Sequence, residues 1–319
     1  MSKQIAIIGA GIAGLAAAQR LKQSGFSVTL FEKSRGAGGR MSTRRIDDLQ
    51  FDHGAQYFTA CGDRFHTLVG QWRSTGHADE WFDGAFVGLP GMTAPARAMA
   101  QGHVLVGGCQ VTALRRDHIG WSIYTVDGLV ETPENGRFAA VILAVPAPLA
   151  VSLAASAGAA LPGLETAHYA PCWALMLAFS QPLALCADRI RPYDDVIDWI
   201  ARNGSKPGRS QEKETVVVHA GSEWSREHLE CSPEAAAHAI VARFQDITGI
   251  SAQPYLCAAH RWRYALVERV AGAAFLWNEG ARLGACGDWC LGPRVECAFD
   301  SGEAIAHGIL QTLEAHLVD

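Results

Sequence analysis

The strongest constraint on the fold is a glycine pattern near the N-terminus. Gly9-Ala10-Gly11-Ile12-Ala13-Gly14 is a G-x-G-x-x-G motif that joins a β-favouring run, Gln4 to Ile8, to a helix-forming stretch. The first glycine permits a tight turn, the second lets a pyrophosphate approach the backbone, and the third lets the helix pack on its strand. The helix N-terminus then offers free N–H groups and the positive end of its dipole to the phosphates. The motif therefore predicts a dinucleotide-binding strand–turn–helix unit.

A second predicted strand supplies the acidic residue that such a unit uses. Ser27 to Phe31 is β-favouring and ends at Glu32, eighteen residues after Gly14. A carboxylate at this position can accept hydrogen bonds from both ribose hydroxyls of an adenosine and would repel a 2′-phosphate. These features predict a bound dinucleotide and leave both FAD and NAD open.

The segments after Glu32 narrow this choice. Lys33 to Arg40 ends in Gly-Gly-Arg, which lets a loop wrap a dinucleotide while Arg40 addresses a phosphate or the flavin side. With the next segment, Asp52-His53-Gly54-Ala55-Gln56-Tyr57-Phe58, the sequence resembles the flavin amine oxidase superfamily, in which such a loop runs past the isoalloxazine ring. Within it, GAQYFTA is most similar to the renalases and their bacterial relatives.

The C-terminal region contributes a third piece. Leu283 to Cys286 predicts a strand that ends at Gly287-Asp288, and Arg294 to Gly302 leads into a predicted helix. In the FAD enzymes that the chain resembles, this aspartate reaches the ribityl chain or the pyrophosphate. The following helix aims its N-terminus at the flavin pyrimidine edge, where its dipole stabilises negative charge. Because these segments extend from the start to the end of the chain, FAD is the expected cofactor, and it is expected to be non-covalent because Cys290 lies outside the attachment motif of covalent amine oxidases.

Two middle segments agree with an FAD site. Val104 to Leu114 predicts a strand pair that places Val111 beside the adenine or its neighbouring backbone, and Ala139 to Val145 resembles the VILAVP strand of the superfamily. The expected cofactor-binding residues are Gly9, Gly11, Ile12, Ala13, Gly14, Glu32, Lys33, Gly39, Arg40, Gln56, Tyr57, Val111, Gly287, Asp288 and Val295.

Composition argues against several other classes of protein. The 27 Lys+Arg and 32 Asp+Glu give a net charge of −5, which disfavours a nucleic-acid binder or an anionic membrane surface as partner. The uncharged stretch from Phe138 to Leu164 contains three prolines and predicts a strand, a turn and a buried helix, not a membrane span. The N-terminus lacks the basic leader of a signal peptide. Nine scattered cysteines indicate reduced thiols in a cytoplasmic protein. The cluster Cys286, Cys290 and Cys297 has no C-x-x-C pair and is expected to consist of free buried thiols, not a metal site.

We expect an α/β fold with two domains. The first is a Rossmann-type FAD-binding domain over 1–62, 92–165 and 268–319. The second is a smaller α+β substrate domain with an antiparallel sheet, over 63–91 and 166–267, as in flavin amine oxidases and p-hydroxybenzoate hydroxylase-like proteins. Within it, 172–179, 215–221 and 255–262 predict strands and Pro233 to Ile247 predicts a helix. The polar, Gly/Pro-containing segment 202–213 predicts a mobile loop.

Aromatic and basic residues indicate what the second domain could bind. Stacked rings suit a planar heteroaromatic or cationic substrate, and core packing is the alternative for each ring. The basic residues either address an anionic substrate, such as a dinucleotide, or are solvated surface charges. The aromatic candidates are Trp173, Trp199, Trp224, Trp262, Trp289 and Tyr57, and the basic ones are Arg202, Lys206, Arg209, Arg261 and Arg263.

The resemblance to bacterial renalase-like proteins covers most of the chain and includes SRGAGGRMSTR, WIARNGSKPGR, HRWRYA and GDWC. It implies an FAD-dependent oxidase of the 2- and 6-dihydro isomers of NAD(P)H. Hydride passes to flavin N5, NAD(P)⁺ leaves, and O₂ reoxidises the flavin to give H₂O₂. Between Asp83 and Val87 the chain is shorter than the family pattern, so this pocket wall is expected to differ. The resemblance implies a substrate pocket lined by Tyr57, Phe58, Thr59, Ala60, Cys61, Trp173 and Trp289.

Such a reaction needs little acid–base chemistry, because the product is an aromatic pyridinium and the protein mainly has to align the donor carbon. We therefore expect no catalytic side chain, and we expect His219 and His260 to be core residues. A flavin-dependent amine oxidase and an FAD-binding redox protein without oxidase turnover remain the alternatives. The expected partners are a small-molecule substrate, which is a dihydronicotinamide dinucleotide or an amine, and O₂.

Overall fold

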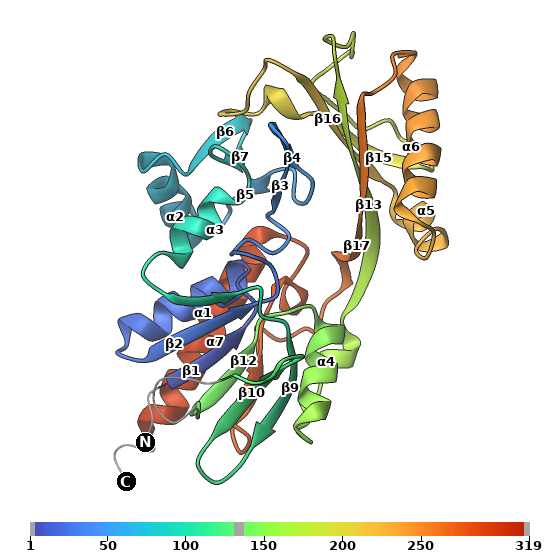
Figure 1. Ribbon diagram of the computed structural model, residues 1–319. Coiled ribbons are helices and arrows are strands. Elements are labelled where there is room, and N and C mark those ends of the chain that lie inside the picture. Colours follow the sequence, from blue (N-terminus) through green and yellow to red (C-terminus); the bar gives the residue numbers. More distant parts are fainter. Residues whose placement is uncertain (1–3, 131–136, 316–319) are drawn as a thin grey trace.

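A computed structural model describes residues 4–130 and 137–315 and contains a central parallel sheet (Figure 1). Its strand order is β18-β19-β12-β1-β2-β8, and only β18 runs antiparallel to its neighbour. The strands are β1 (Gln4–Ile8), β2 (Ser27–Glu32), β8 (Val104–Gly107), β12 (Ala140–Leu143), β18 (Leu276–Asn278) and β19 (Leu283–Ala285). This order brings strands from both ends of the chain next to β1.

Both faces of this sheet are covered, which explains why β1 is an almost continuous apolar run. Ile5 and Ile7 pack on the face that carries α1 (Ile12–Gln23) and α7 (Val295–Ala315). Ala6 and Ile8 pack on the opposite face. There they meet α4 (Ala147–Ser156) and a three-stranded sheet of β9 (Val111–Arg116), β10 (Trp121–Thr125) and β11 (Gly128–Leu129). The predicted Rossmann-type α/β fold is confirmed.

The prediction of a strand pair over Val104 to Leu114 is wrong. β8 and β9 belong to different sheets: β8 pairs with β2, whereas β9 pairs with β10. Gly108 lies between them at φ +67°, a left-handed conformation that lets the chain change direction.

A second, antiparallel sheet stands above the first, with strand order β14-β15-β16-β13-β17 (Figure 1). Its strands are β13 (His168–Phe179), β14 (Arg189–Ile190), β15 (Ile197–Arg202), β16 (Glu214–Ala220) and β17 (Leu256–Arg269). The helices α5 (Ser222–Glu227) and α6 (Pro233–Thr248) cover its outer face. Its inner face meets a hairpin of β3 (Thr43–Ile46) and β4 (Leu49–Asp52). The three predicted strands and the helix of this region are therefore present.

A small three-stranded sheet lies on the inner side of the antiparallel sheet. It contains β5 (Phe58–Thr59), β6 (Ala78–Phe82) and β7 (Ala85–Gly88), and it lies beside α2 (Asp63–Ser74) and α3 (Ala94–Ala100). At the place where the sequence is expected to be shorter than the family pattern, Asp83 and Gly84 form a two-residue hairpin loop, with Gly84 at φ +69°. Phe82 is therefore the last strand residue before a tight turn.

Two predicted segments have clear outcomes. The stretch 138–164 forms β12, a Pro146 turn and α4, and no helix within residues 4–130 and 137–315 has the length and apolar character to cross a membrane. The prediction of a mobile loop over 202–213 is wrong for residues 202–209. There Asn203, Lys206 and Arg209 are buried, and η2 (Asn203–Ser205) is a short 3₁₀ helix.

Candidate cofactor site

The glycine turn leaves open space where the motif predicts phosphates. A Cβ atom at Gly9 would lie 2.4 Å from the Ala144 carbonyl oxygen, and one at Gly14 would lie 2.1 Å from the Gly9 carbonyl oxygen. At Gly11, by contrast, a Cβ would meet nothing within 4 Å. The N-terminus of α1 has no side-chain cap and no acidic residue in its first turn. Its N–H groups are thus available to an anion that approaches Gly11.

Glu32 lies directly beside this turn. It is 6% exposed, and its carboxylate accepts hydrogen bonds from the backbone N–H groups of Ala10 (2.9 Å) and Ser34 (2.8 Å). The Glu32 carbonyl accepts a third bond from the N–H of Cys109, which brings the start of β9 and Val111 close to the end of β2. Lys33, the next residue, is exposed.

A second loop and the C-terminal segment meet the same turn. A Cβ at Gly39 would lie 3.4 Å from the Gly11 Cα. Arg40 donates to the Asp288 carboxylate (2.5 Å) and to the Ala265 carbonyl (3.2 Å). Although burial opposes its charge, the attraction of Asp288 raises the pKa of Arg40 above its usual value. Asp288 opens the 3₁₀ helix η3 (Asp288–Cys290) directly after Gly287, and α7 starts shortly afterwards at Val295.

These residues fit FAD. The structure has an uncapped helix N-terminus, open space at the middle glycine, and a buried carboxylate at the end of the second strand. Residues from the first and last parts of the chain converge there, as the sequence predicts. Ile12 and Ala13 lie buried in the first turn of α1, where a Cβ at Gly302 would lie 2.1 Å from the Ala13 carbonyl oxygen, so α7 packs closely on α1.

The inner face of the antiparallel sheet forms a wall of aromatic rings on the side of the Asp52–Tyr57 segment. Strand register places Trp199 opposite His219, His219 opposite Ala174, and Ala174 opposite His260. These four residues form one row across β15, β16, β13 and β17. Trp262 follows two residues after His260 on the same face of β17. We call Trp199, His219, His260 and Trp262 the inner wall.

His53 binds this wall to the loop that carries Gln56 and Tyr57. Its backbone carbonyl accepts hydrogen bonds from Trp262 Nε1 (2.9 Å) and His219 Nε2 (3.2 Å). Its ring lies 4.8 Å from that of His260 and 5.1 Å from that of Trp262. Burial lowers the pKa of His53 to about 3 and the pKa values of His219 and His260 to about 4. All three imidazoles are therefore neutral near neutral pH. His219 and His260 are partly buried and line the inner wall, so the expectation that they are core residues is wrong.

A buried ionic group lies next to the wall. It consists of Asp52, Gln56, Lys206 and Arg209, and we call it the Asp52 cluster. Arg209 donates Nε (3.1 Å) and Nη2 to Asp52 Oδ2, and Lys206 Nζ lies 3.6 Å from the same oxygen and 3.0 Å from Gln56 Oε1. The Gln56 amide donates to the Asp52 carbonyl (2.6 Å).

The two cations of this cluster share one carboxylate. Burial opposes ionisation of Asp52, but Lys206 and Arg209 outweigh it and hold the Asp52 pKa below its usual value. Burial, together with the charge of Arg209, lowers the pKa of Lys206 to about 8 despite the opposing attraction of Asp52. Near neutral pH the cluster thus carries one negative and two positive charges.

The sequence did not predict this cluster. Lys206 and Arg209 were expected to address a substrate or to be solvated, and both expectations are wrong because the two side chains are buried and paired with Asp52. Arg261 and Arg263 pair with Glu230, and Arg202 pairs with Glu214.

Three residues predicted to line the substrate pocket are core residues in the structure. Trp173 precedes Ala174 on β13, so it points to the outer face, where its Nε1 donates to the His228 carbonyl (3.0 Å). Trp289 is fully buried and donates Nε1 to the Val145 carbonyl (3.1 Å). Phe58 packs against a ring cluster with Phe65, Trp72 and Phe86. Substrate contact is therefore not supported for these three.

The remaining predicted pocket residues divide into two places. Tyr57 lies at the inner wall, 6.0 Å from the Trp199 ring and 5.2 Å from the Phe82 ring. Thr59, Ala60 and Cys61 follow β5 toward the N-terminus of α7, where the Cys61 N–H donates to the Glu296 carboxylate (3.1 Å). Cys61 is exposed there.

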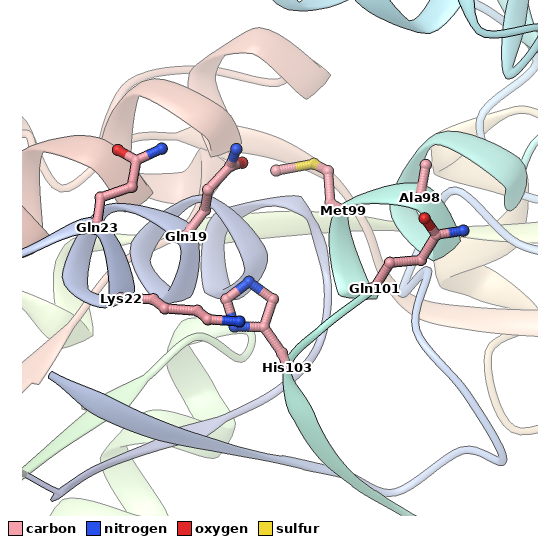
Figure 2. Close-up of a pocket in the computed structure, with 7 residues that line it drawn as sticks. All are labelled: Gln19, Lys22, Gln23, Ala98, Met99, Gln101 and His103. Atoms are coloured by element: carbon pink, nitrogen blue, oxygen red, sulfur yellow. The ribbon is translucent and has the colours of Figure 1, made fainter. Parts of the chain in front are cut away.

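Other candidates lie away from the site. Trp224 stacks on His228 at 4.1 Å on the outer side of the sheet. Cys286, Cys290 and Cys297 are buried free thiols, as predicted. A surface hollow of about 420 Å³ lies between α1 and α3. The residues that line it, shown in Figure 2, are Gln19, Lys22, Gln23, Ala98, Met99, Gln101 and His103. It lies at the opposite end of α1 from Gly11 and so is separate from the cofactor site.

Together, the fold and the site define a dinucleotide-binding α/β protein of the flavoprotein class. Residues 7–72 match an NAD(P)-binding Rossmann-like domain, and residues 71–282 of the 319 match the flavin containing amine oxidoreductase family. The chain belongs to the flavin containing amine oxidoreductase family. Membership confirms, at the level of the family, FAD as cofactor and a flavin-dependent oxidoreductase as the class of protein.

Individual relatives agree in fold or over a short stretch of sequence. The chain is 41% identical over 76 residues to the 4,4′-diapophytoene desaturase (4,4′-diaponeurosporene-forming) of Staphylococcus aureus (strain Newman), a match over 21% of this chain and only 15% of that relative. It resembles the structure of a protein from Exiguobacterium sp. 255-15 that is provisionally named protoporphyrinogen oxidase (TM-score 0.77, 14% identity, 98% and 99% of the two chains). It also resembles cyclohexylamine oxidase from Brevibacterium oxydans IH-35A (TM-score 0.68, 13% identity, 98% and 99%).

Proposed function

We propose that this protein is a renalase-like, FAD-dependent oxidase of the 2- and 6-dihydro isomers of NAD(P)H. In the proposed reaction the dihydropyridine loses a hydride and becomes NAD(P)⁺, and O₂ takes up two electrons and two protons to leave as H₂O₂. We also propose the two-domain division at 1–62, 92–165 and 268–319 against 63–91 and 166–267. Nine free cysteines support a reducing compartment such as the cytoplasm.

The electrostatic character of the inner wall carries this proposal. Its two histidines have pKa values far below neutrality, as has the adjoining His53, so the wall is a neutral aromatic surface suited to a planar ring. The adjacent Asp52 cluster has two cations for one carboxylate, all buried. An ammonium substrate would be repelled by this net positive charge in a poorly screened interior, whereas a dinucleotide that carries phosphates would be attracted.

The side chains at the wall would act by positioning. Bound FAD would supply the hydride acceptor and the route of electrons to O₂. Tyr57 would hold the dihydropyridine ring by stacking, and the wall would exclude water from it. No side chain has to transfer a proton to the donor ring, because loss of hydride alone makes the ring aromatic. The neutral histidines at the wall are consistent with this.

Two alternatives are judged by the same experiment. An amine oxidase is favoured by the family and by the structural likeness to cyclohexylamine oxidase. An FAD-binding redox protein without oxidase turnover is the other. The purified holoprotein is mixed anaerobically in a stopped-flow instrument with dihydro-NAD isomers or with a panel of amines, and the visible flavin band is followed. Rapid bleaching by the isomers alone supports the proposal. Bleaching by amines alone replaces it with amine oxidation, and bleaching by neither favours the redox protein.

A further inference from the structure

A group of rings and guanidinium groups extends the inner wall toward solvent. Tyr57 contacts both Phe82, at the end of β6, and Trp199, on β15. The Arg189 guanidinium lies 3.7 Å from the centre of the Phe82 ring, and that of Arg191 lies 5.5 Å from the centre of the Trp199 ring. We call Phe82, Trp199, Arg189 and Arg191 the Arg189 patch.

The two arginines of the patch are more available than the other cations near the site. Lys206 and Arg209 are buried against Asp52, whereas Arg189 and Arg191 are exposed. Arg191 lies 3.7 Å from Asp198, and this pair is weak because the side chains are 54% and 57% exposed. Within residues 4–130 and 137–315, no carboxylate forms an ion pair with Arg189. The patch therefore has positive charge that can bind an anion.

The polar group of Trp199 adds a second unsatisfied feature. Its indole Nε1 is buried and has no hydrogen-bond partner among the described residues. A buried N–H without an acceptor is costly, so this donor favours a ligand or water oxygen at the patch. Flat ring faces, two available guanidinium groups and a free N–H donor together suit a planar molecule with phosphate oxygens.

The patch is continuous with the cofactor site through one loop. The N–H of Ala55 donates to the Arg40 carbonyl (2.9 Å), Gln56 binds Lys206, and Tyr57 follows at the patch. A molecule whose reacting ring lies at the inner wall could thus extend outward over Phe82 and Trp199. The tight Asp83-Gly84 turn keeps Phe82 at this edge.

We propose that the Arg189 patch binds the adenosine diphosphate half of the dinucleotide substrate, the half that does not react. This inference rests on the proposed function, since it assigns the remote part of that substrate to a surface. The competing explanation is that both arginines only cover exposed rings, and the experiment below distinguishes the two.

The decisive measurement is binding, not turnover. ADP-ribose is titrated into FAD-loaded protein by calorimetry, for the wild type and for an Arg189→Ala/Arg191→Ala double variant. Loss of two charge-assisted contacts should weaken ADP-ribose binding about tenfold or more. The matched control is Arg115→Ala, because Arg115 is an exposed arginine that stacks on Tyr124 at 5.0 Å on the separate β9–β10 sheet. This control should bind ADP-ribose as the wild type does.

A kinetic comparison separates failure of this inference from failure of the proposed function. With dihydro-NAD isomers, the double variant should show a raised apparent Kd for flavin bleaching and an unchanged limiting rate. With the corresponding dihydronicotinamide mononucleotide, which lacks the adenylate, the double variant should differ much less from the wild type. If dihydro-NAD bleaches the wild type but the double variant binds ADP-ribose equally well, the patch assignment is wrong and the proposed function stands. If dihydro-NAD does not bleach the wild type, the proposed function is wrong.

Discussion

Asp52→Asn should destabilise the folded protein strongly, because it leaves two buried cations without an anion. The Asp52 side chain is fully buried and accepts hydrogen bonds from Arg209, the Met92 N–H (2.9 Å) and the Thr43 hydroxyl (2.7 Å). Asparagine has nearly the same shape but no charge. Breaking a buried ion pair by removing one partner costs about 3–5 kcal/mol.

This free energy converts into a measurable change in Tm. With an unfolding entropy of about 2.1 cal/mol/K per residue, a chain of 319 residues unfolds with about 0.7 kcal/mol/K. The expected loss is therefore a Tm lower by about 4–7 °C. Circular dichroism during heating, with FAD saturating in every sample, measures it.

Asp48→Asn is the matched control for this variant. Asp48 lies at the turn of the same β3–β4 hairpin and pairs with Lys213, but the two side chains are 67% and 43% exposed. An exposed pair contributes about 0–1 kcal/mol, so its loss should lower the Tm by about 1 °C or less. Equal Tm losses for the two variants would refute the assignment of a stabilising buried cluster.

A second substitution tests whether the loss comes from the unpaired charges. Lys206→Met removes one of the two buried cations, so Asp52→Asn/Lys206→Met should be more stable than Asp52→Asn alone. Strict additivity of the two single losses would contradict the electrostatic explanation, since it would show that Asp52 and Lys206 do not interact.

Three other outcomes follow from the site. Gly11→Ala should leave the Tm of the FAD-free protein unchanged, because its Cβ meets no protein atom, but it should weaken FAD binding. Gly14→Ala should lower the Tm even of the FAD-free protein, because its Cβ clashes with a backbone oxygen. FAD titrations and thermal melts of both variants measure these effects. Glu32→Ala should lower the FAD content of purified protein, measured as the ratio of visible to ultraviolet absorbance, and an unchanged ratio would contradict the ribose assignment. The free energy of unfolding should fall as the pH falls from 6.5 toward about 4, because His53, His219 and His260 bind protons in the unfolded chain but stay neutral in the folded protein. In thermal melts across this range, the Tm of a His260→Asn variant should depend less steeply on pH than that of the wild type.

The parts of the fold that local sequence determines could be predicted. The first strand, the glycine turn and the first helix follow from a β-favouring apolar run and from three glycines, two of which have no space for a Cβ. The helix predicted over 233–247 is α6 (Pro233–Thr248), because Ser232 caps its N-terminus and Gly249 ends it at φ +69°. In each case the signal lies within a few residues of the structure that it specifies.

The wall and its ionic cluster depend on partners far apart in sequence. Arg209 binds Asp52, which lies 157 residues earlier in the sequence. Without knowledge of that partner, the polar composition of the segment around Arg209 predicted a surface loop. Trp173 shows a second reason why the site could not be predicted fully from the sequence. Successive side chains of a strand point to opposite faces of the sheet, and the sequence alone did not show which of the two faces the site. Its neighbour Ala174 lies in the row with His219 and His260, so a shift of one residue would exchange core and wall.

The positions of the cations around the inner wall indicate more about the proposed substrate than the net charge of the chain does. The chain carries −5 overall, which disfavours polyanionic partners as a class. Around the wall, however, Lys206 and Arg209 exceed their one carboxylate, and Arg189 and Arg191 lie exposed on aromatic rings at its edge. Cations gathered at one site attract an anion locally even when the rest of the surface is acidic, and salt weakens that attraction only where the charges are exposed. Raising the ionic strength should thus weaken ADP-ribose binding through the Arg189 patch while it leaves the Asp52 cluster, and with it the Tm difference between wild type and Asp52→Asn, nearly unchanged.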